Sequence, residues 1–457
     1  MSEAEALPEL FSKYLDAAEA VDPIKCAGRI SKVQGLLIES RGPQAVIGEV
    51  CRIETPRQTL LAEVVGLRDE TVQLMAYGET GGIEVGNRVV ASGSQLEVPV
   101  SRELLGRVLD YMGRPSDGKA EPACTESYPA MASPPDPLKR RLIRERIVTG
   151  VRAVDGLLAC GKGQRLGIFA GSGVGKSTLL GMIARNTNAD VNVVALIGER
   201  GREVNDFIVN DLGPDGFARS VVIASPSNSA PLARLRGAYV AAAVAEYFRD
   251  QGLDVMLLFD SVTRFARAQR EIGLAIGEPP ATRGYTPSVF DSMPKLLERS
   301  GTSGRGSITG FYTVLVDGDD MDEPIADTVR GILDGHIVLS RRLAQGFHFP
   351  AIDVLASISR LMPAVAGPVS QKAAGYIRRL MAVYAEAEDL INVGAYHANS
   401  NPAIDEAIAK RKAVLDFLIQ EVDDRAPLTE TLNQMAGISG IQIPEEEKQP
   451  YQPGGPG

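Results

Sequence analysis

Histidine and cysteine are scarce in this 457-residue chain, and long uncharged apolar runs are missing. The three histidines are too dispersed for a metal site of the usual ligand spacing. The four cysteines form no C-x-x-C pair, so we expect reduced thiols instead of a disulfide framework or a zinc site. We expect no membrane-spanning helix, and the first residues lack the basic and apolar regions of a signal peptide. These absences predict a cytoplasmic protein.

The charge balance limits the partners of the chain. Its net charge is -10 and its pI is about 5.1, which argues against a general electrostatic grip on nucleic acid. Hydrophobic residues make up 44% and charged residues 23%, as in ordinary soluble globular proteins. The length predicts about two to four domains, and no internal repeat is visible.

The first hundred residues contain two different patterns. Residues 1–23 carry apolar side chains three and four positions apart, which predicts a short amphipathic helix. This helix could pack on its own protein, or it could dock on a partner or a neighbouring subunit. Residues 24–100 contain short runs rich in Val, Ile and Leu between Gly and Asn, which predict a compact all-β barrel.

Strands and helices alternate in the middle of the chain. The apolar runs at 166–169, 193–198, 221–225 and 255–260 are separated by helical stretches, which predicts a mostly parallel sheet covered on both faces. The end of the sequence is polar and rich in Pro and Gly, which indicates disorder. We therefore predict a docking helix (1–23), a β-barrel (24–100), a connector (101–148), an α/β core (149–367), a helical domain (368–443) and a disordered tail (444–457).

The stretch AGSGVGKST, from Ala170 to Thr178, follows the apolar run LGIF and precedes a helical stretch. In this context a glycine-rich loop points backbone N–H groups at phosphate oxygens, and the helix N-terminus adds a favourable dipole. Lys176 supplies a cation for the phosphates of ATP, and Ser177 a hydroxyl for Mg²⁺. Ala170 replaces the first glycine of the usual pattern, which should cost little where φ is negative. The residues predicted to bind the nucleotide are Gly171, Ser172, Gly173, Val174, Gly175, Lys176, Ser177 and Thr178.

Charged residues follow three of the apolar runs. Asp260 ends VMLLFD, at the right distance from the phosphate loop to orient Mg²⁺. Glu199 follows VVALIG on the side where ligands bind in open α/β sheets, so it is our candidate general base. Its alternative is a salt bridge with Arg200 or Arg202. Arg360 ends VLASISR; it is a surface arginine in isolation, but in a ring it could reach a neighbour's γ-phosphate as an arginine finger.

Several long motifs resemble one family. Catalytic subunits of rotary ATP synthases are similar to this chain in GERGREVNDF, YFRDQG, LLFDSVTRFARAQREIGLAIGEPPATRGYTPSVF and GFHFPAIDVLASISR. The sequences FAGSGVGKSTLLGMIARN and ALIGERGREVNDF more closely resemble the ATPase of type III protein export, and most of all the flagellum-specific one. The resemblance covers about residues 25–440, and Ala170 is the usual residue of that family.

This resemblance implies an α/β fold: a RecA-like P-loop ATPase core with an N-terminal β-barrel and a C-terminal helical domain. It also implies a hexameric ring with sites between subunits. The catalytic residues implied by position are Lys176, Glu199, Arg200, Arg264 and Arg360, with Ser177 and Asp260 at the Mg²⁺ ion. Phe349 falls where the family places an aromatic residue against adenine. However, Phe347 is two residues away, and a core role for Phe349 is an equal alternative.

The activity that the resemblance implies is ATP hydrolysis coupled to unfolding and export of flagellar proteins. The implied partners are other copies of the chain, a regulatory export protein on the N-terminal helix, a central stalk protein, an export gate in the membrane, and export chaperones and substrates. The implied location is the cytoplasm, peripherally at the inner face of the cytoplasmic membrane. The acidic segment 316–324 matches the part that faces the stalk, with a solvated loop as its alternative.

Four other functions are alternatives to this one. The same ATPase in a virulence injectisome is not separated from a flagellar one by sequence physics, although overall similarity favours the flagellar one. The predicted N-terminal helix and the motif FAGSGVGKS argue against an ATP synthase catalytic subunit. An RNA translocase needs stacking aromatic residues in its barrel, and residues 24–100 offer only Tyr77. A non-enzymatic regulatory subunit is disfavoured because Lys176 and Glu199 are both present.

Overall fold

The computed structural model describes residues 27–316, 318 and 320–449. They form two compact units that divide between Leu96 and Glu97. The predicted docking helix (1–23) lies outside the described residues, as do Asp317 and Asp319 of the acidic segment. Across the described ranges, no helix combines the length and apolarity needed to cross a membrane.

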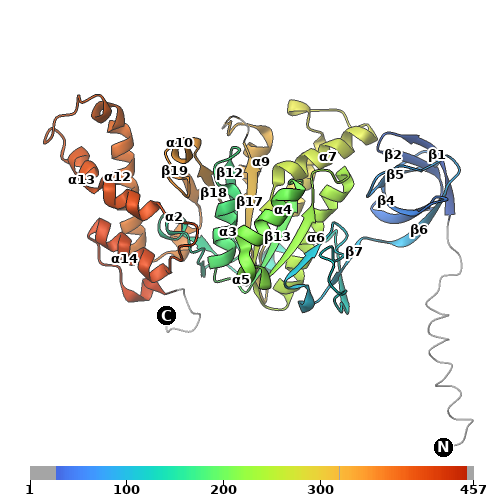
Figure 1. Ribbon diagram of the computed structural model, residues 1–457, viewed down its shortest axis with the longest axis horizontal. Helices are drawn as coiled ribbons and strands as arrows, with labels where there is room; N and C mark the ends of the chain where they lie inside the picture. The colour runs from blue at the N-terminus through green and yellow to red at the C-terminus, as the bar shows by residue number, and fades with distance from the viewer. Residues whose placement is uncertain (1–26, 317, 319, 450–457) are drawn as a thin grey trace, which may run out of the picture. The chain divides into compact units, whose positions relative to one another are not determined.

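The first unit is the β-barrel that the sequence predicts, closed in the order β1-β2-β5-β4-β3-β6 (Figure 1). Side chains such as Ile30, Ile38 and Leu74 are buried inside it. The barrel ends with β6, so 97–100, which the prediction assigned to it, fall in the second unit. Its strands are β1 (Ala27–Gln34), β2 (Leu37–Arg41), β3 (Glu49–Glu54), β4 (Thr59–Arg68), β5 (Thr71–Ala76) and β6 (Arg88–Gln95).

The second unit is built on a sheet ordered β19-β18-β12-β17-β15-β13-β14-β8 (Figure 1). Neighbours in this order are parallel, except that β18 and β19 are antiparallel. The strands are β8 (Arg107–Leu109), β12 (Arg165–Ala170), β13 (Val191–Ile197), β14 (Ser220–Ser225), β15 (Asp254–Asp260), β17 (Ser307–Leu315), β18 (Gly335–Leu339) and β19 (Ile352–Ser359), with β16 (Gly301–Thr302) beside β17. The four predicted apolar runs coincide with β12, β13, β14 and β15.

The segment predicted as a connector contributes to this unit. Its β8 extends the sheet beside β14, and β9 (Glu126–Pro129) pairs with β7 (Glu97–Val100). Arg299, which is 1% exposed, donates a hydrogen bond to the Ala130 carbonyl and forms an ion pair with Glu246. The segment is therefore fastened to the core, and its three-residue strand is too short to give a sequence signal.

Helices cover both faces of the sheet. Val194 and Leu196 of β13 pack in one cluster with α3, whereas a Cβ at Gly237 of α6 would lie 3.2 Å from Ile197. The alternation along β13 thus places α3 and α6 on opposite faces. The helices of this part are α2 (Arg152–Leu157), α3 (Lys176–Asn186), α4 (Gly201–Asp206), α5 (Gly213–Ala218), α6 (Pro231–Asp250), α7 (Val262–Ile276), α8 (Pro287–Leu297), α9 (Pro324–Ile332), α10 (Arg341–Gln345) and α11 (Met362–Val365).

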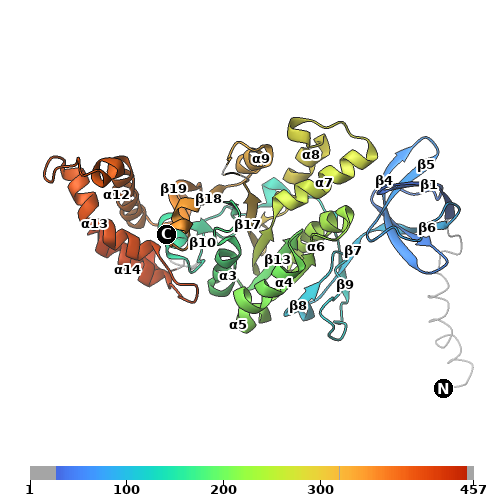
Figure 2. The ribbon, with the colours of Figure 1, turned by 45° about the horizontal axis from the view of Figure 1, so that its top comes forward.

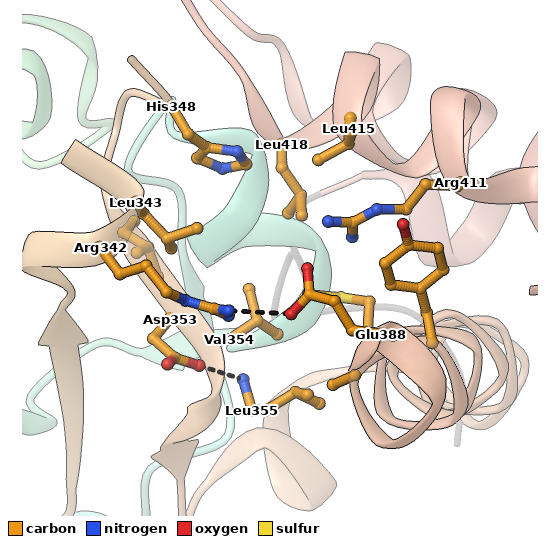
Figure 3. A pocket seen from close by; sticks show the side chains of 14 residues that line it. Arg342, Leu343, His348, Asp353, Val354, Leu355, Glu388, Arg411, Leu415 and Leu418 are labelled. Atoms are coloured by element: carbon orange, nitrogen blue, oxygen red, sulfur yellow. Dashed lines mark hydrogen bonds and ion pairs between the residues drawn. The ribbon is translucent and has the colours of Figure 1, made fainter. Parts of the chain in front are cut away.

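Three longer helices follow: α12 (Pro368–Asn392), α13 (Pro402–Leu418) and α14 (Leu428–Ser439), as predicted from the charged helical pattern (Figure 2). Their apolar faces, including Ile377 and Phe417, join the cluster that packs on the α3 side of the sheet. An ion pair of 2.9 Å between Arg342 of α10 and Glu388 of α12 adds a polar link (Figure 3).

The predicted disordered tail is partly ordered. Residues Glu445–Lys448 form a 3-10 turn, and the Glu447 carboxylate accepts hydrogen bonds from the backbone N–H groups of Val369 and Ser370. This carboxylate satisfies donors in the first turn of α12, which have no partner inside the helix. The prediction of disorder is therefore wrong for 445–448, and residues 450–457 lie outside the described residues.

Candidate active site

The phosphate-loop stretch connects the end of β12 to the start of α3. Gly173 and Gly175 have φ values of 77° and 87°, which only glycine adopts readily, so the loop depends on both. Ala170 is instead the last residue of β12 and pairs with Leu315 and Leu339 in the two neighbouring strands. Its strand conformation explains why alanine replaces the expected glycine without cost.

Three charged side chains meet beside this loop. Lys176 Nζ lies 2.5 Å from Asp260 Oδ1 and 3.5 Å from Glu199 Oε1. The side chains of Lys176 and Glu199 are each 12% exposed, and that of Asp260 is 4% exposed. The register explains why they meet, because Leu196 of β13 pairs with Asp260 of β15 and Glu199 lies two residues beyond the end of β13. Both predicted carboxylates thus share one lysine.

Burial and neighbouring charges shift the pKa values of Lys176 and Glu199. Burial alone would lower the pKa of Lys176, but the nearby Asp260 and Glu199 charges outweigh it and hold that pKa above its ordinary value. Burial and the negative charge of Asp260 raise the pKa of Glu199, and Lys176 and Arg264 only partly offset them. Lys176 therefore stays charged, and Glu199 is a stronger base than an exposed glutamate.

Two further residues support the cluster. Thr313 of β17, which is fully buried, donates a hydrogen bond of 2.7 Å from its hydroxyl to Asp260 Oδ1. Arg264 lies on the first turn of α7, and its side chain packs against Gly198, where an added Cβ would be 2.9 Å from the Arg264 Cβ. The charge of Arg264 lowers the pKa of Glu199 and so acts on that carboxylate. Thr313 was not identified from the sequence.

A pocket of about 410 Å³ opens beside the phosphate loop. Phe349 reaches Gly175, where an added Cβ would lie 3.6 Å from the ring, and the side chain is 39% exposed, so it lines the pocket instead of the core. Phe347 lines the same pocket and is 85% exposed. The remaining wall is Thr178, Leu179, Met182, Pro350, Ile419, Gln420, Glu421 and Val422. No sequence motif singled out 419–422.

The two other predicted arginines lie elsewhere. The side chain of Arg200 is 76% exposed and forms an ion pair of 3.5 Å with Glu203 on the first turn of α4. Arg360 directly follows β19, which runs antiparallel to β18. Ser359 pairs with Gly335, whereas Ala170 pairs with Leu339, four residues and roughly 13 Å further along β18. Arg360 therefore lies near the start of β18, whereas the phosphate loop of its own chain lies near the end of β18. The two are at opposite ends of the strands of the sheet.

The donor set fits a Mg²⁺ ion held mainly by substrate phosphates. Ser177 and Asp260 supply a hydroxyl and a carboxylate, and the buried Glu199 Oε1 has no well-formed hydrogen bond among the described residues. Within those residues, no group of three or more His, Cys, Asp or Glu could hold a metal alone. Mg²⁺ commonly uses one or two carboxylates together with phosphates and keeps several waters.

Three family models match successive parts of the chain. The β-barrel domain of the ATP synthase alpha/beta family matches 30–93, and the nucleotide-binding domain of that family matches 150–359. The C-terminal domain of the T3SS EscN ATPase matches 366–437. The matches follow the order of barrel, sheet-based core and C-terminal helices in the structure.

Relatives match along almost the whole chain. The flagellum-specific ATP synthase of Treponema pallidum is 58% identical over 437 residues, which is 95% of this chain and 98% of that protein. The type 3 secretion system ATPase of Xanthomonas euvesicatoria is 51% identical over 414 residues, covering 90% and 94%. The assembled EscN of enteropathogenic E. coli, solved with its central stalk EscO, has a TM-score of 0.85 at 45% identity and covers 90% of this chain and 100% of that one. The chain therefore belongs to the ATP synthase alpha/beta family, within its branch of type III export ATPases.

Proposed function

We propose that the chain is a Mg²⁺-dependent ATPase that energises unfolding and export of flagellar proteins through a type III export apparatus. The observation that carries this proposal is the buried cluster of Lys176, Asp260 and Glu199 beside the phosphate loop. A lysine with two carboxylates in a low-dielectric site matches what ATP hydrolysis needs: phosphate binding, metal orientation and activation of water.

The residues divide the chemistry between them. The loop N–H groups and Lys176 hold the phosphates, and Ser177 and Asp260 would hold Mg²⁺, which neutralises charge on the phosphate oxygens when bound. Glu199 orients a water and accepts its proton as the water attacks the γ-phosphorus, while the bond to the bridging oxygen breaks and ADP leaves. Arg264 provides a positive charge near the γ-phosphate. Removing one such contact typically costs about 3–4 kcal/mol of transition-state stabilisation.

The base of ATP belongs in the pocket lined by Phe349. Its volume of about 410 Å³ and its mostly apolar wall suit a flat heterocycle that stacks on an aromatic ring. The pocket begins at Gly175 and Thr178, so a nucleotide seated there would extend its phosphates along the loop. The partial exposure of Phe349 supports adenine contact over a core role.

Arg360 completes the site of a neighbouring subunit. Because it lies at the edge opposite its own phosphate loop, it can reach a γ-phosphate only in another copy. The relative EscN has been solved as an assembled ATPase with a central stalk, which supports a ring with a stalk for this chain as well. We place Arg200 near the phosphates only after a rearrangement of α4, since its guanidinium pairs outward with Glu203.

The remaining partners follow from the family: a regulatory export protein on the N-terminal helix, an export gate at the membrane, and export chaperones and substrates. A location in the cytoplasm beside the inner face of the membrane follows with them. The 51% identity to a type 3 secretion system ATPase supports an injectisome role as a second candidate.

Substitution of the cluster tests the activity. Lys176→Ala and Glu199→Gln should each abolish ATP turnover while leaving circular dichroism and assembly unchanged. Ordinary turnover by either variant contradicts the site. In the native cell, deletion of the gene should remove flagellar filaments, and the Glu199→Gln allele should not restore them. Intact filaments with loss of other secreted proteins would instead establish the injectisome role.

A further inference from the structure

The segment 417–424, which begins in the last turn of α13, is held by side chains from the sheet-bearing part of the molecule. Arg152 of α2 donates a hydrogen bond of 2.9 Å to the Phe417 carbonyl. Arg185, near the end of α3, donates one of 2.7 Å to the Val422 carbonyl. Since α3 begins at Lys176, one helix touches the phosphate site at its start and this segment at its end. The segment forms one wall of the nucleotide pocket.

Gln420 is the centre of this attachment. Its side-chain amide donates to the carbonyls of Gly150 at 2.8 Å and Asp424 at 3.1 Å, and its Oε1 accepts from Arg152 N at 2.9 Å. It is 3% exposed, so these bonds are shielded from water. Both donor positions of the amide are thus used for anchoring, and its buried oxygen already accepts one hydrogen bond.

The backbone of Gln420 in turn holds the aromatic wall. Its N–H donates a hydrogen bond of 2.9 Å to the Phe349 carbonyl. On the far side of this loop, His348 is 7% exposed and lines a separate cavity of about 70 Å³ with Leu343 and Leu418 (Figure 3). The loop therefore presents Phe349 to the nucleotide pocket and His348 to the C-terminal helices.

The anchor on Gly150 is itself rigid. The carboxylate of Asp155, which is fully buried, accepts hydrogen bonds from Thr149 N at 2.9 Å and from Gly150 N at 2.8 Å. The chain of contacts thus runs from the Asp155 turn through Gln420 to Phe349. The Gln420 side chain fixes the backbone whose N–H holds the Phe349 carbonyl, so it controls where the ring of Phe349 lies.

We infer that Gln420 is a positioning residue for nucleotide binding, which seats Phe349 and the 419–422 wall against the base. The inference rests on the proposed ATPase function. Because Gln420 acts on the base end of the pocket, its loss should weaken ATP binding without affecting the phosphate cluster. Inorganic tripolyphosphate, which has phosphates but no base, separates these two ends.

The chain contains no tryptophan, so Phe349→Trp gives a single fluorescent reporter of pocket occupancy. In that background, Gln420→Ala should raise the Kd of MgATP about tenfold, which corresponds to about 1.4 kcal/mol. The inhibition constant of tripolyphosphate should stay within about twofold. Without the reporter, Gln420→Ala should raise KM by a similar factor and leave kcat within about twofold.

Gln434→Ala in α14 is the matched control, because among the described residues its amide donates a single hydrogen bond, of 3.3 Å, to Glu430 on the same helix. It should leave both constants unchanged. Equal weakening of MgATP and tripolyphosphate by Gln420→Ala would overturn the inference, since Gln420 would then support the fold in general. An unchanged Kd for MgATP would overturn it as well. If the reporter protein with Gln420 intact shows no response to MgATP, the proposed ATPase function fails first.

Discussion

The position of Arg360 makes a quantitative prediction for mixed rings. Lys176, Glu199 and Asp260 lie at one edge of the sheet, and Arg360 lies at the other. A site would therefore take its phosphate half from one subunit and Arg360 from the next. Rings of Arg360→Ala alone should lose turnover by about 10³-fold or more, the usual worth of an arginine finger, while still binding ATP.

Mixing Arg360→Ala with Lys176→Ala subunits should restore activity. In a random equimolar ring, about one quarter of the interfaces join an intact Lys176 to an intact Arg360. The mixture should therefore reach up to about one quarter of the native rate, at least about a hundredfold above either variant alone. Phosphate release at a concentration that maintains assembly measures this rate, and size-exclusion chromatography checks that mixed rings form.

A second mixture supplies the control. Lys176→Ala and Glu199→Gln affect the same half of the site, so no interface between these variants is complete and their mixture should stay inactive. Rescue in the first mixture alone is the result that the assignment of Arg360 to the opposite half requires. Rescue in both would indicate exchange with contaminating native subunits, and rescue in neither would place Arg360 outside the shared site.

Four further outcomes follow from the site. Because burial and Asp260 raise the pKa of Glu199, this base should take up a proton at a higher pH than an exposed glutamate, so kcat should fall on acidification already above the ordinary glutamate range. A raised pKa means that the folded protein favours protonated Glu199, so the contribution of this residue to stability is lost as pH rises through that pKa. Glu199→Gln should therefore melt no lower than the native protein at pH 7 in a scanning-fluorimetry series, and a clear drop in melting temperature would contradict this. Thr313→Val removes the 2.7 Å hydrogen bond to Asp260 and should lower kcat/KM about tenfold in steady-state assays, whereas native kinetics would show that Asp260 needs no such support. Gly175→Ala forces alanine to φ = 87°, which a residue with a side chain adopts only with strain, so nucleotide binding by the fluorescent reporter should fall at least about fivefold while far-UV circular dichroism is retained.

The sequence predicted those parts of the fold that depend on continuous apolar runs. The strands β12, β13, β14 and β15 are buried at all but one residue or at every residue, and their apolar runs are long enough to recognise. The strand β8 has only three residues and was placed in a connector, because its burial depends on pairing with β14, more than a hundred residues away. Short strands of this kind are specified by tertiary contacts.

The candidate site was predictable to a similar extent. Lys176 begins the helix after the phosphate loop, Glu199 and Asp260 stand at or just beyond strand ends, and the structure brings the three together. The edge on which Arg360 lies could not be read from its motif, because it depends on β19 running antiparallel to β18. Gln420 gave no signal at all, since its partner Gly150 lies 270 residues earlier in the chain.

The attachment of residues 445–448 to α12 through Glu447 has a consequence for the neighbouring subunit. Its carboxylate closes the first turn of α12, and that helix begins just after Arg360 and α11. An added Cβ at Gly367 would lie 2.1 Å from the carboxyl carbon of Glu447, so the two segments are in direct contact. If Arg360 serves the adjacent copy, a chain cut short before Glu447 would carry an intact pocket of its own and a loosened contribution to the next one. The truncation would therefore reduce turnover at the site of the neighbouring subunit.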